Sequence, residues 1–315
     1  MSAARLPCLA LVVLLPRVAA AAPPDPFLPD DTQAVASVQL RELRQAPAVK
    51  KYLGPDLEKW LGRGPAGSVA GLLRGLKVEP LQDIDRLTVA VTPDRFLLIA
   101  RGRFDPAAVG SAAEKLARKE PDVLRIHGDG ARSLYEYREP NGAVPAVFLR
   151  FLDGETAVAS TSRDLVQQAA ARKQPKISPE LQVLLDRVDS KATVWLAGRV
   201  APDWKKRLEV PPEYQRLADS LQSFHGAVTV GDDVRADFAL QTNDPKAAVE
   251  IRKVAEGVKA LLILAAANQN AKNGPVWADL LSALKVASAD RAVTLRGQMT
   301  ADQLDRSTQD SKKKP

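Results

Sequence analysis

The sequence contains two copies of one pattern, separated by a constant 139 residues. A valine, an aspartate and an Asp-Pro pair mark each copy, at Val91, Asp94 and Asp105-Pro106 and again at Val230, Asp233 and Asp244-Pro245. An apolar run lies between the two aspartates in both copies. A shared offset at separated positions indicates a duplicated structural unit, so we expect the chain to fold as two related halves.

Each copy combines strand and helix patterns in the same order. In the first copy, alternating apolar residues over Leu87–Val91 and the apolar run Phe96–Ala100 predict the two strands of a hairpin. Asp105 then predicts a helix N-cap, with Pro106 at the first helical position, where a missing N–H does no harm. In the second copy, alternation over Val234–Leu240 predicts the equivalent strand.

The last helix of each copy is marked by an N-capping pattern. Thr161 with Asp164 three residues later predicts a helix start in the first copy. Thr300 with Gln303 predicts a capping box in the second, and Thr300 again follows its counterpart by 139 residues.

The predicted order in each copy is strand–helix–strand–strand–helix–strand with a terminal helix. This order predicts an α+β protein of two tandem related βαββαβ-like (ferredoxin-like) units, each an antiparallel sheet with helices packed on one face. The copies differ over one stretch, since residues 120–155 have strand patterns and residues 259–290 have helical ones. A function carried by one copy alone is expected in that stretch.

The first residues resemble a secretory signal peptide. Arg5 supplies positive charge, Leu6–Leu15 is apolar but too short to span a bilayer, and Val18–Ala22 offers small residues for cleavage near Ala21. A frayed cytoplasmic N-terminus is the alternative. We therefore expect export to the periplasm or the exterior, with no transmembrane segment after cleavage. The expected division is a signal peptide at 1–21, a proline-rich lead-in at 22–29, repeat domains at 30–173 and 174–306, and a disordered basic tail at 307–315.

Composition excludes several classes of protein. The only cysteine, Cys8, lies in the expected signal peptide, so the mature chain has no disulfide and no thiolate. The net charge is +7, but basic residues are dispersed among acidic ones and form no stripe with aromatic readers. Nucleic-acid binding is therefore not expected. The partner is expected to be an extracytoplasmic protein or envelope component.

No residue pattern matches a known catalytic motif. The chain has two distant histidines and no G-x-S-x-G element, which leaves no zinc site and no serine-hydrolase elbow in the sequence. If the protein is an enzyme, the candidate acid–base groups are His127, Asp129 and Glu136. The simpler interpretation of Gly128-Asp129-Gly130 is a turn between two strands. We predict no metal and no cofactor.

Two other features have structural explanations that we favour. The letters of Gly62–Gly67 match G-x-G-x-x-G, but they follow what looks like a helix end, whereas a nucleotide-binding loop follows a strand. The tryptophans and the tyrosines Tyr135 and Tyr137 could stack on sugars, but they fall at positions expected to face a core.

Three segments are similar to an uncharacterised family of secreted proteins of planctomycete-type bacteria. They are Leu28–Val35, Leu81–Val89 and Gly226–Asp233, and the resemblance extends over residues 28 to about 305. No activity is known for that family. The resemblance implies export and a repeated α+β architecture, and it implies nothing about chemistry.

The favoured hypothesis is an exported, soluble, non-catalytic protein that binds or scaffolds something outside the cytoplasm. The alternatives are a secreted hydrolase that uses carboxylates and a carrier of an apolar ligand. A hydrolase predicts a pocket in which carboxylates, or a carboxylate and His127, lie within reach. A carrier predicts an apolar cavity of about 300 Å³ or more. A scaffold predicts an exposed apolar patch or sheet edge instead.

Overall fold

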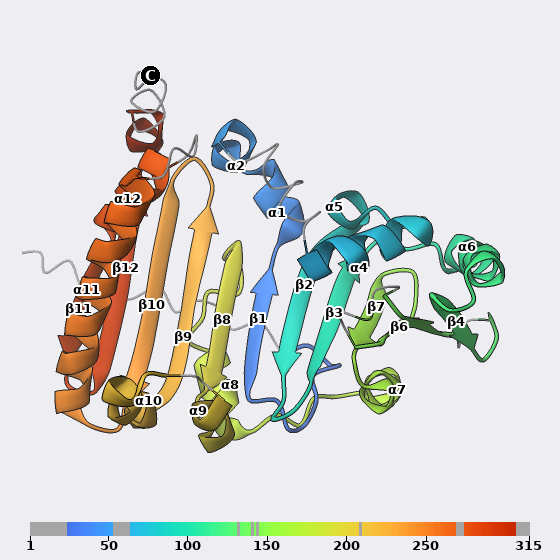
Figure 1. Cartoon of the computed structure of the whole chain (residues 1–315), viewed down its shortest axis with the longest axis horizontal. Coiled ribbons are helices and arrows are strands. Elements are labelled where there is room, and N and C mark those ends of the chain that lie inside the picture. The colour runs from blue at the N-terminus through green and yellow to red at the C-terminus, as the bar shows by residue number, and fades with distance from the viewer. Residues whose placement is uncertain are drawn as a thin grey trace, which may run out of the picture.

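The computed structural model describes residues 24–52, 64–130, 133–139, 142, 145–207, 210–268 and 274–306. Its strands form one antiparallel sheet with the order β11-β12-β10-β9-β8-β1-β2-β3-β7-β6-β5-β4 (Figure 1). The strands are β1 (Ala34–Val38), β2 (Ile84–Val91), β3 (Phe96–Gly102), β4 (Leu124–His127), β5 (Leu134–Tyr137), β6 (Val147–Phe151), β7 (Thr156–Ser160), β8 (Val194–Arg199), β9 (Leu221–Val230), β10 (Val234–Thr242), β11 (Lys285–Ala289) and β12 (Ala292–Met299).

Helices connect these strands and pack on the sheet. They are α1 (Leu40–Gln45), α2 (Pro47–Tyr52), α4 (Gly64–Gly75), α5 (Pro80–Asp83), α6 (Pro106–Lys119), α7 (Arg163–Ala171), α8 (Pro179–Leu185), α9 (Pro202–Arg207), the 3₁₀ turn η2 (Pro212–Tyr214), α10 (Gln215–Ser220), α11 (Pro245–Asn268) and α12 (Gly274–Ala283). Residues 301–306 are also helical. The mixed α and β content agrees with the predicted class. No helix within the described ranges is both long enough and apolar enough to cross a bilayer.

The two halves of the sheet have matching strand orders. From the centre outward, one half begins β1-β2-β3-β7-β6 and the other runs β8-β9-β10-β12-β11, and β5 and β4 extend the first half beyond β6. The strands β2, β3, β6 and β7 overlap β9, β10, β11 and β12 when shifted by 139 residues. The halves meet where β1 pairs antiparallel with β8, with Ala36 opposite Leu196. Both copies therefore share one continuous sheet.

This arrangement does not confirm two ferredoxin-like units. In each half the first three strands are sequence neighbours in a meander, and every strand pair among the described residues is antiparallel. A split βαβ unit instead joins two parallel strands by a helix, with another strand inserted between them. The segment between β1 and β2 carries α1, α2, α4 and α5 but returns the chain to the adjacent antiparallel position.

The prediction that helices cover one face is wrong for the first half, because two clusters pack on opposite faces of its strands. Leu98 and Ala100 of β3 join the cluster beneath α4 and α6, whereas Leu97 and Ile99 join the cluster beneath α7 and α8. Successive strand residues point to opposite faces, so β3 is buried on both sides. The continuous apolar run Phe96–Ala100 is the sequence signal of that double burial.

In the second half, α8 packs on β8 and β9, whereas helices cover the outer strands β10, β12 and β11 on one face only. There α11 contacts β10, β11 and β12, and α12 contacts β12, as Figure 1 shows at the red end of the sheet. The opposite face of β10 and β12 carries exposed polar residues, including an ion pair between Arg296 and Asp237 at 3.1 Å. The alternation predicted for Val234–Leu240 is therefore confirmed. The helical interpretation of residues 259–290 is wrong at its end, where Lys285–Ala289 forms β11.

Two of the predicted helix starts are confirmed, one in each copy. Asp105 caps α6 by accepting from the Ala107 and Ala108 N–H groups at 3.0 Å, as predicted. In the second copy the Gln303 side chain accepts from the Thr300 N–H at 2.9 Å, and Thr300 Oγ1 accepts from the Gln303 N–H at 3.4 Å, which confirms the capping box.

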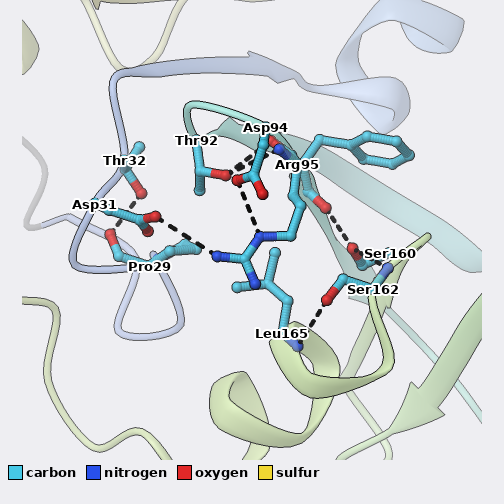
Figure 2. Close-up of polar contacts among 10 residues, drawn as sticks. Pro29, Asp31, Thr32, Thr92, Asp94, Arg95, Ser160, Ser162 and Leu165 are labelled. Carbon is cyan, nitrogen blue, oxygen red and sulfur yellow. Dashed lines mark hydrogen bonds and ion pairs between the residues drawn. The ribbon is translucent and has the colours of Figure 1, made fainter.

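The predicted Thr161 cap is wrong by one residue. Ser162 accepts from the Leu165 N–H at 3.4 Å and caps α7. Ser160, the last residue of β7, accepts from the Ser162 N–H and donates to the Phe96 carbonyl, as Figure 2 shows. This contact fixes the β7–α7 junction to β3, and it moves the helix start by one position relative to the second copy.

Several sequence predictions lie outside the described residues. They are the signal peptide, the first residues of the glycine motif at 62–63 and the tail at 307–315. Within the described residues, α1 ends at Gln45 and α2 begins at Pro47, a residue that cannot continue a preceding helix.

Candidate functional site

An apolar cavity lies between the sheet and the helices of the first half. Its volume is about 370 Å³. The floor is formed by β2, β3, β6 and β7, and the cover by α1, α4 and α5. Figure 1 shows α4 crossing β2 and β3 on this face. The cavity thus occupies the face opposite the α7 and α8 cluster.

Small residues on neighbouring strands create this space. Ala100 lies opposite Ala157, and Leu98 lies opposite Ala159, so alanines cover much of the floor beneath α4. A leucine or phenylalanine at these positions would extend into the space. Protein interiors otherwise pack to crystal-like density with few voids larger than a water molecule. A space of this size is therefore larger than the voids that ordinary packing leaves in a protein interior.

Aromatic residues make one wall of the cavity rigid. The Phe104 and Phe151 rings meet edge to face at a centroid distance of 5.3 Å, and Tyr135 meets Phe151 in the same way at 6.2 Å. Tyr135 and Tyr137 are buried in this cluster, which confirms the prediction that they belong to a core. Edge-to-face pairs stabilise such a wall beyond the area they bury.

The cavity offers almost no polar groups to a ligand. Among its lining residues within the described ranges, Arg74 alone is charged, and the others are apolar. The Arg74 side chain is half-exposed and forms an ion pair with Glu79 at 3.5 Å. Apolar cavities of this kind admit apolar molecules. The arrangement therefore suits binding and provides no group for acid–base chemistry.

The candidate acid–base residues are only partly brought together. His127 on β4 and Glu136 on β5 form a hydrogen bond of 2.6 Å between Nε2 and Oε2. Asp129 is exposed in the turn after β4, and within the described residues it has no hydrogen bond or ion pair with either of them. Two of the three predicted residues therefore meet, and the second carboxylate does not.

Glu136 is held as an ionised acceptor. Its other oxygen accepts from the Arg138 guanidinium at 2.6–2.7 Å. The hydrogen bond from His127, followed by that from Arg138, lowers the pKa of Glu136 below its ordinary value of 4.5 against the opposing effect of burial. A general acid or base needs a pKa near the working pH. The pair suits a structural ion-pair network at the sheet edge better than catalysis.

Two further cavities lie elsewhere, and neither contains this pair. A polar depression of about 810 Å³ is lined by residues of mixed charge that include Asp31, Arg199 and Lys205. Figure 2 shows the Asp31 side of it, where Arg95 joins Asp31 at 3.8 Å and Asp94 at 3.2 Å. A third cavity of about 290 Å³ lies beneath the lead-in segment. Within the described residues no group of three or more potential metal ligands is found.

An exposed apolar patch lies on α11. We use the name "α11 patch" for four large apolar residues in its C-terminal half, whose exposed fractions are between 48% and 67%: Val258, Leu261, Leu262 and Leu264. Lys259 points away from the patch, because its Nζ donates to the Leu284 carbonyl at 3.0 Å and pairs with Glu256. The sequence predicts helix for residues 259–290 but does not show which of these side chains are exposed. A helix that is apolar all round usually indicates burial, so the sequence carried no signal of this exposure.

Comparison with known proteins identifies only distant structural likenesses. No family model matches the chain, and no curated protein sequence matches it. The solved structure of crystal form IV of TP0453 superposes with a TM-score of 0.48 at 10% sequence identity, covering 91% of this chain and 96% of that one. Crystal form III of TP0453 gives a TM-score of 0.47 at 9% identity, covering 91% and 98%.

Proposed function

We propose that this protein is an exported, non-catalytic binding protein that carries an apolar ligand in the cavity beneath α4. The observation that carries the proposal is the apolar space of about 370 Å³ itself. Ligand sites are typically of 300–1,000 Å³ with mostly apolar walls and a few polar groups. Arg74 is the single charged residue among the described lining residues and can contact one polar end of a ligand. The rest of the ligand would contact apolar side chains.

The alanine floor allows the cavity to be filled without changing the surface. The Ala159→Phe variant places a ring in the cavity between β3 and β6. We expect it to reduce binding of the fluorescent apolar probe N-phenyl-1-naphthylamine at least tenfold. The matched control is Ala287→Phe on β11, where the residue is exposed and outside the cavity. We expect this control to bind the probe as the parent protein does.

Adding a ring to a fully packed core costs about 1–3 kcal/mol of stability. Thermal unfolding therefore distinguishes a variant that has lost its binding cavity from one that is destabilised. If Ala159→Phe binds less probe at an unchanged melting temperature, the cavity is the binding site. If it melts early, Ala100→Leu gives a smaller filling on the same floor. The proposal fails if both filling variants bind the probe as tightly as the parent protein. Mass spectrometry of organic extracts of the native protein then identifies the ligand.

A second candidate function is favoured by the α11 patch. Monomeric proteins rarely leave large apolar side chains grouped on one helix face unless a partner covers them. The patch supports scaffolding, with an extracytoplasmic protein or an envelope component as the partner. A double Leu261→Glu, Leu264→Glu variant tests it by co-purification from the cell envelope. Recovery of the same partner by the double variant and by the parent protein contradicts this function.

The hydrolase alternative has the least support. It requires two carboxylates, or a carboxylate and His127, facing a pocket. Glu136 is occupied by His127 and Arg138, and none of the three cavities is lined by His127, Asp129 or Glu136.

A further inference from the structure

The third cavity lies on the sheet face opposite the apolar cavity, at the centre of the molecule. Strands β1, β2, β3 and β8 form its floor, and the lead-in segment Pro24–Leu28 closes one side. The loop after α8 closes another side through Val188 and Ser190. The cavity measures about 290 Å³ and combines apolar walls with several polar groups.

Two arginines face each other on the floor of this cavity. Arg86 of β2 lies opposite Arg101 of β3 in the antiparallel register, so both side chains are on one face. Both line the cavity. Two guanidinium groups side by side repel one another, and bringing them out of water costs free energy unless anions compensate.

Arg101 has an anionic partner, although its Nε, like that of Arg86, is buried without an acceptor. It pairs with both carboxylate oxygens of Asp25 at 3.2 Å and donates to Thr156 Oγ1 at 2.8 Å. Its guanidinium also lies 5.1 Å from the centre of the Phe27 ring. These contacts fasten the lead-in segment to β3. Asp25 forms its ion pair with Arg101 and none with Arg86.

Arg86 has no such partner. Within the described residues it forms no ion pair and no hydrogen bond, and its Nε is buried without an acceptor. The charged lining residues are Arg86, Arg101 and Asp25, which leaves the cavity with one positive charge in excess. A buried hydrogen-bond donor without an acceptor is costly, and a cation without an anion is more so. An anion beside Arg86 would remove both costs.

The apolar walls of this cavity indicate the chemical character of the rest of the ligand. Trp195 of β8, Leu28 and Val35 line the cavity together with Leu185 and Val188. The hydroxyl of Thr88 is engaged by Ser37 at 3.1 Å, which leaves few polar groups besides Arg86 for a ligand. We propose that this cavity binds an organic monoanion, a carboxylate attached to an apolar body, with the carboxylate on the Arg86 guanidinium and the body against Trp195. Guanidinium groups match carboxylates in a planar, bidentate geometry.

Isothermal titration calorimetry with 4-phenylbutyrate and its neutral amide tests the proposal on the purified protein. We expect the carboxylate to bind at least tenfold more tightly than the amide. We expect Arg86→Gln to weaken binding of the carboxylate at least tenfold and Arg86→Lys to weaken it less, because lysine keeps the charge and loses the planar fork. Binding should also change the fluorescence of the parent protein and not that of a Trp195→Phe variant.

Arg150→Gln is the matched control. Arg150 is also a strand arginine of the first half with a buried, unpartnered Nε, but it does not line this cavity. It should bind the carboxylate as the parent protein does. Equal binding of the carboxylate and the amide, unchanged binding by Arg86→Gln, or no binding by the folded parent protein would each overturn the proposal. Tighter binding of inorganic phosphate than of 4-phenylbutyrate would contradict the inference that the ligand has an apolar body.

Discussion

Gly226 of β9 lies directly beneath the ring of Phe238, its partner across the β9–β10 ladder. A Cβ at position 226 would stand 2.7 Å from both Phe238 Cγ and the Asp237 carbonyl oxygen. The ring therefore occupies the space above the glycine, which is how an aromatic residue compensates for a strand glycine. This pair stabilises the β9–β10 ladder at the centre of the second half.

The first prediction concerns that glycine. Gly226→Ala should destabilise the protein by about 1–3 kcal/mol, because the ring must leave its position to admit the methyl group. Gly231→Ala in the turn after β9 is the control, since a Cβ there meets nothing within 4 Å. It should change stability by less than about 0.5 kcal/mol. Urea unfolding of both variants measures the difference, and equal effects would contradict the packing described.

The second prediction concerns the α7 cap. Ser162→Ala should cost about 1 kcal/mol of unfolding free energy, the usual value of a lost N-cap. Thr161→Ala should cost less, because the structure gives the capping hydrogen bond to Ser162. Thermal unfolding of the two variants distinguishes them. A larger loss for Thr161→Ala would restore the cap position that the sequence pattern indicated.

The third prediction concerns pH and Glu136. Its pKa is lower in the folded protein than its ordinary value of 4.5, chiefly because of the hydrogen bond with His127. A carboxyl group with a lowered folded-state pKa stabilises the fold above the unfolded pKa, and this stabilisation is lost as the pH falls through the folded pKa. The stability difference between the parent protein and Glu136→Gln should therefore be largest above about pH 5 and decrease below about pH 4.

Urea unfolding of both proteins across this pH range measures that effect. His127→Asn provides the comparison, because it removes the main cause of the lowered pKa and leaves Arg138 in place. We expect its stability to fall less steeply below about pH 4 than that of the parent protein. Parallel curves for all three proteins would show that His127 and Glu136 do not interact as described.

The fourth prediction concerns the α11 patch. Leu261 and Leu264 are exposed by 67% and 59%, so replacing both with glutamate should change the unfolding free energy by less than about 1 kcal/mol. The same change should reduce binding of the dye 8-anilinonaphthalene-1-sulfonate and any self-association seen by analytical ultracentrifugation. A strongly destabilised double variant would mean that these leucines are covered by the protein itself.

The sequence raised the possibility of an apolar-ligand carrier but did not indicate which residues line the cavity. Leu98, Ala159 and the leucines of α4 enclose one cavity, although these residues are far apart in the chain. The same holds for Arg86 and Arg101, whose pairing depends on the β2–β3 register. The contact of His127 with Glu136 was easier to foresee, because a short hairpin joins β4 to β5.

The sequence alone determined the local elements and the duplication. The alternation over Val234–Leu240, the Asp105 cap and the 139-residue offset each depend on neighbours within a few residues or on copied letters, and each corresponds to a feature of the structure. Tertiary structure alone decided that β1 would pair with β8 and fuse both copies into one sheet. Backbone hydrogen bonds between strand edges carry no side-chain signature, so no pattern in either copy specifies its partner. The cavities follow from that pairing and from the helices packed over it, because a void is defined by residues that only folding brings together.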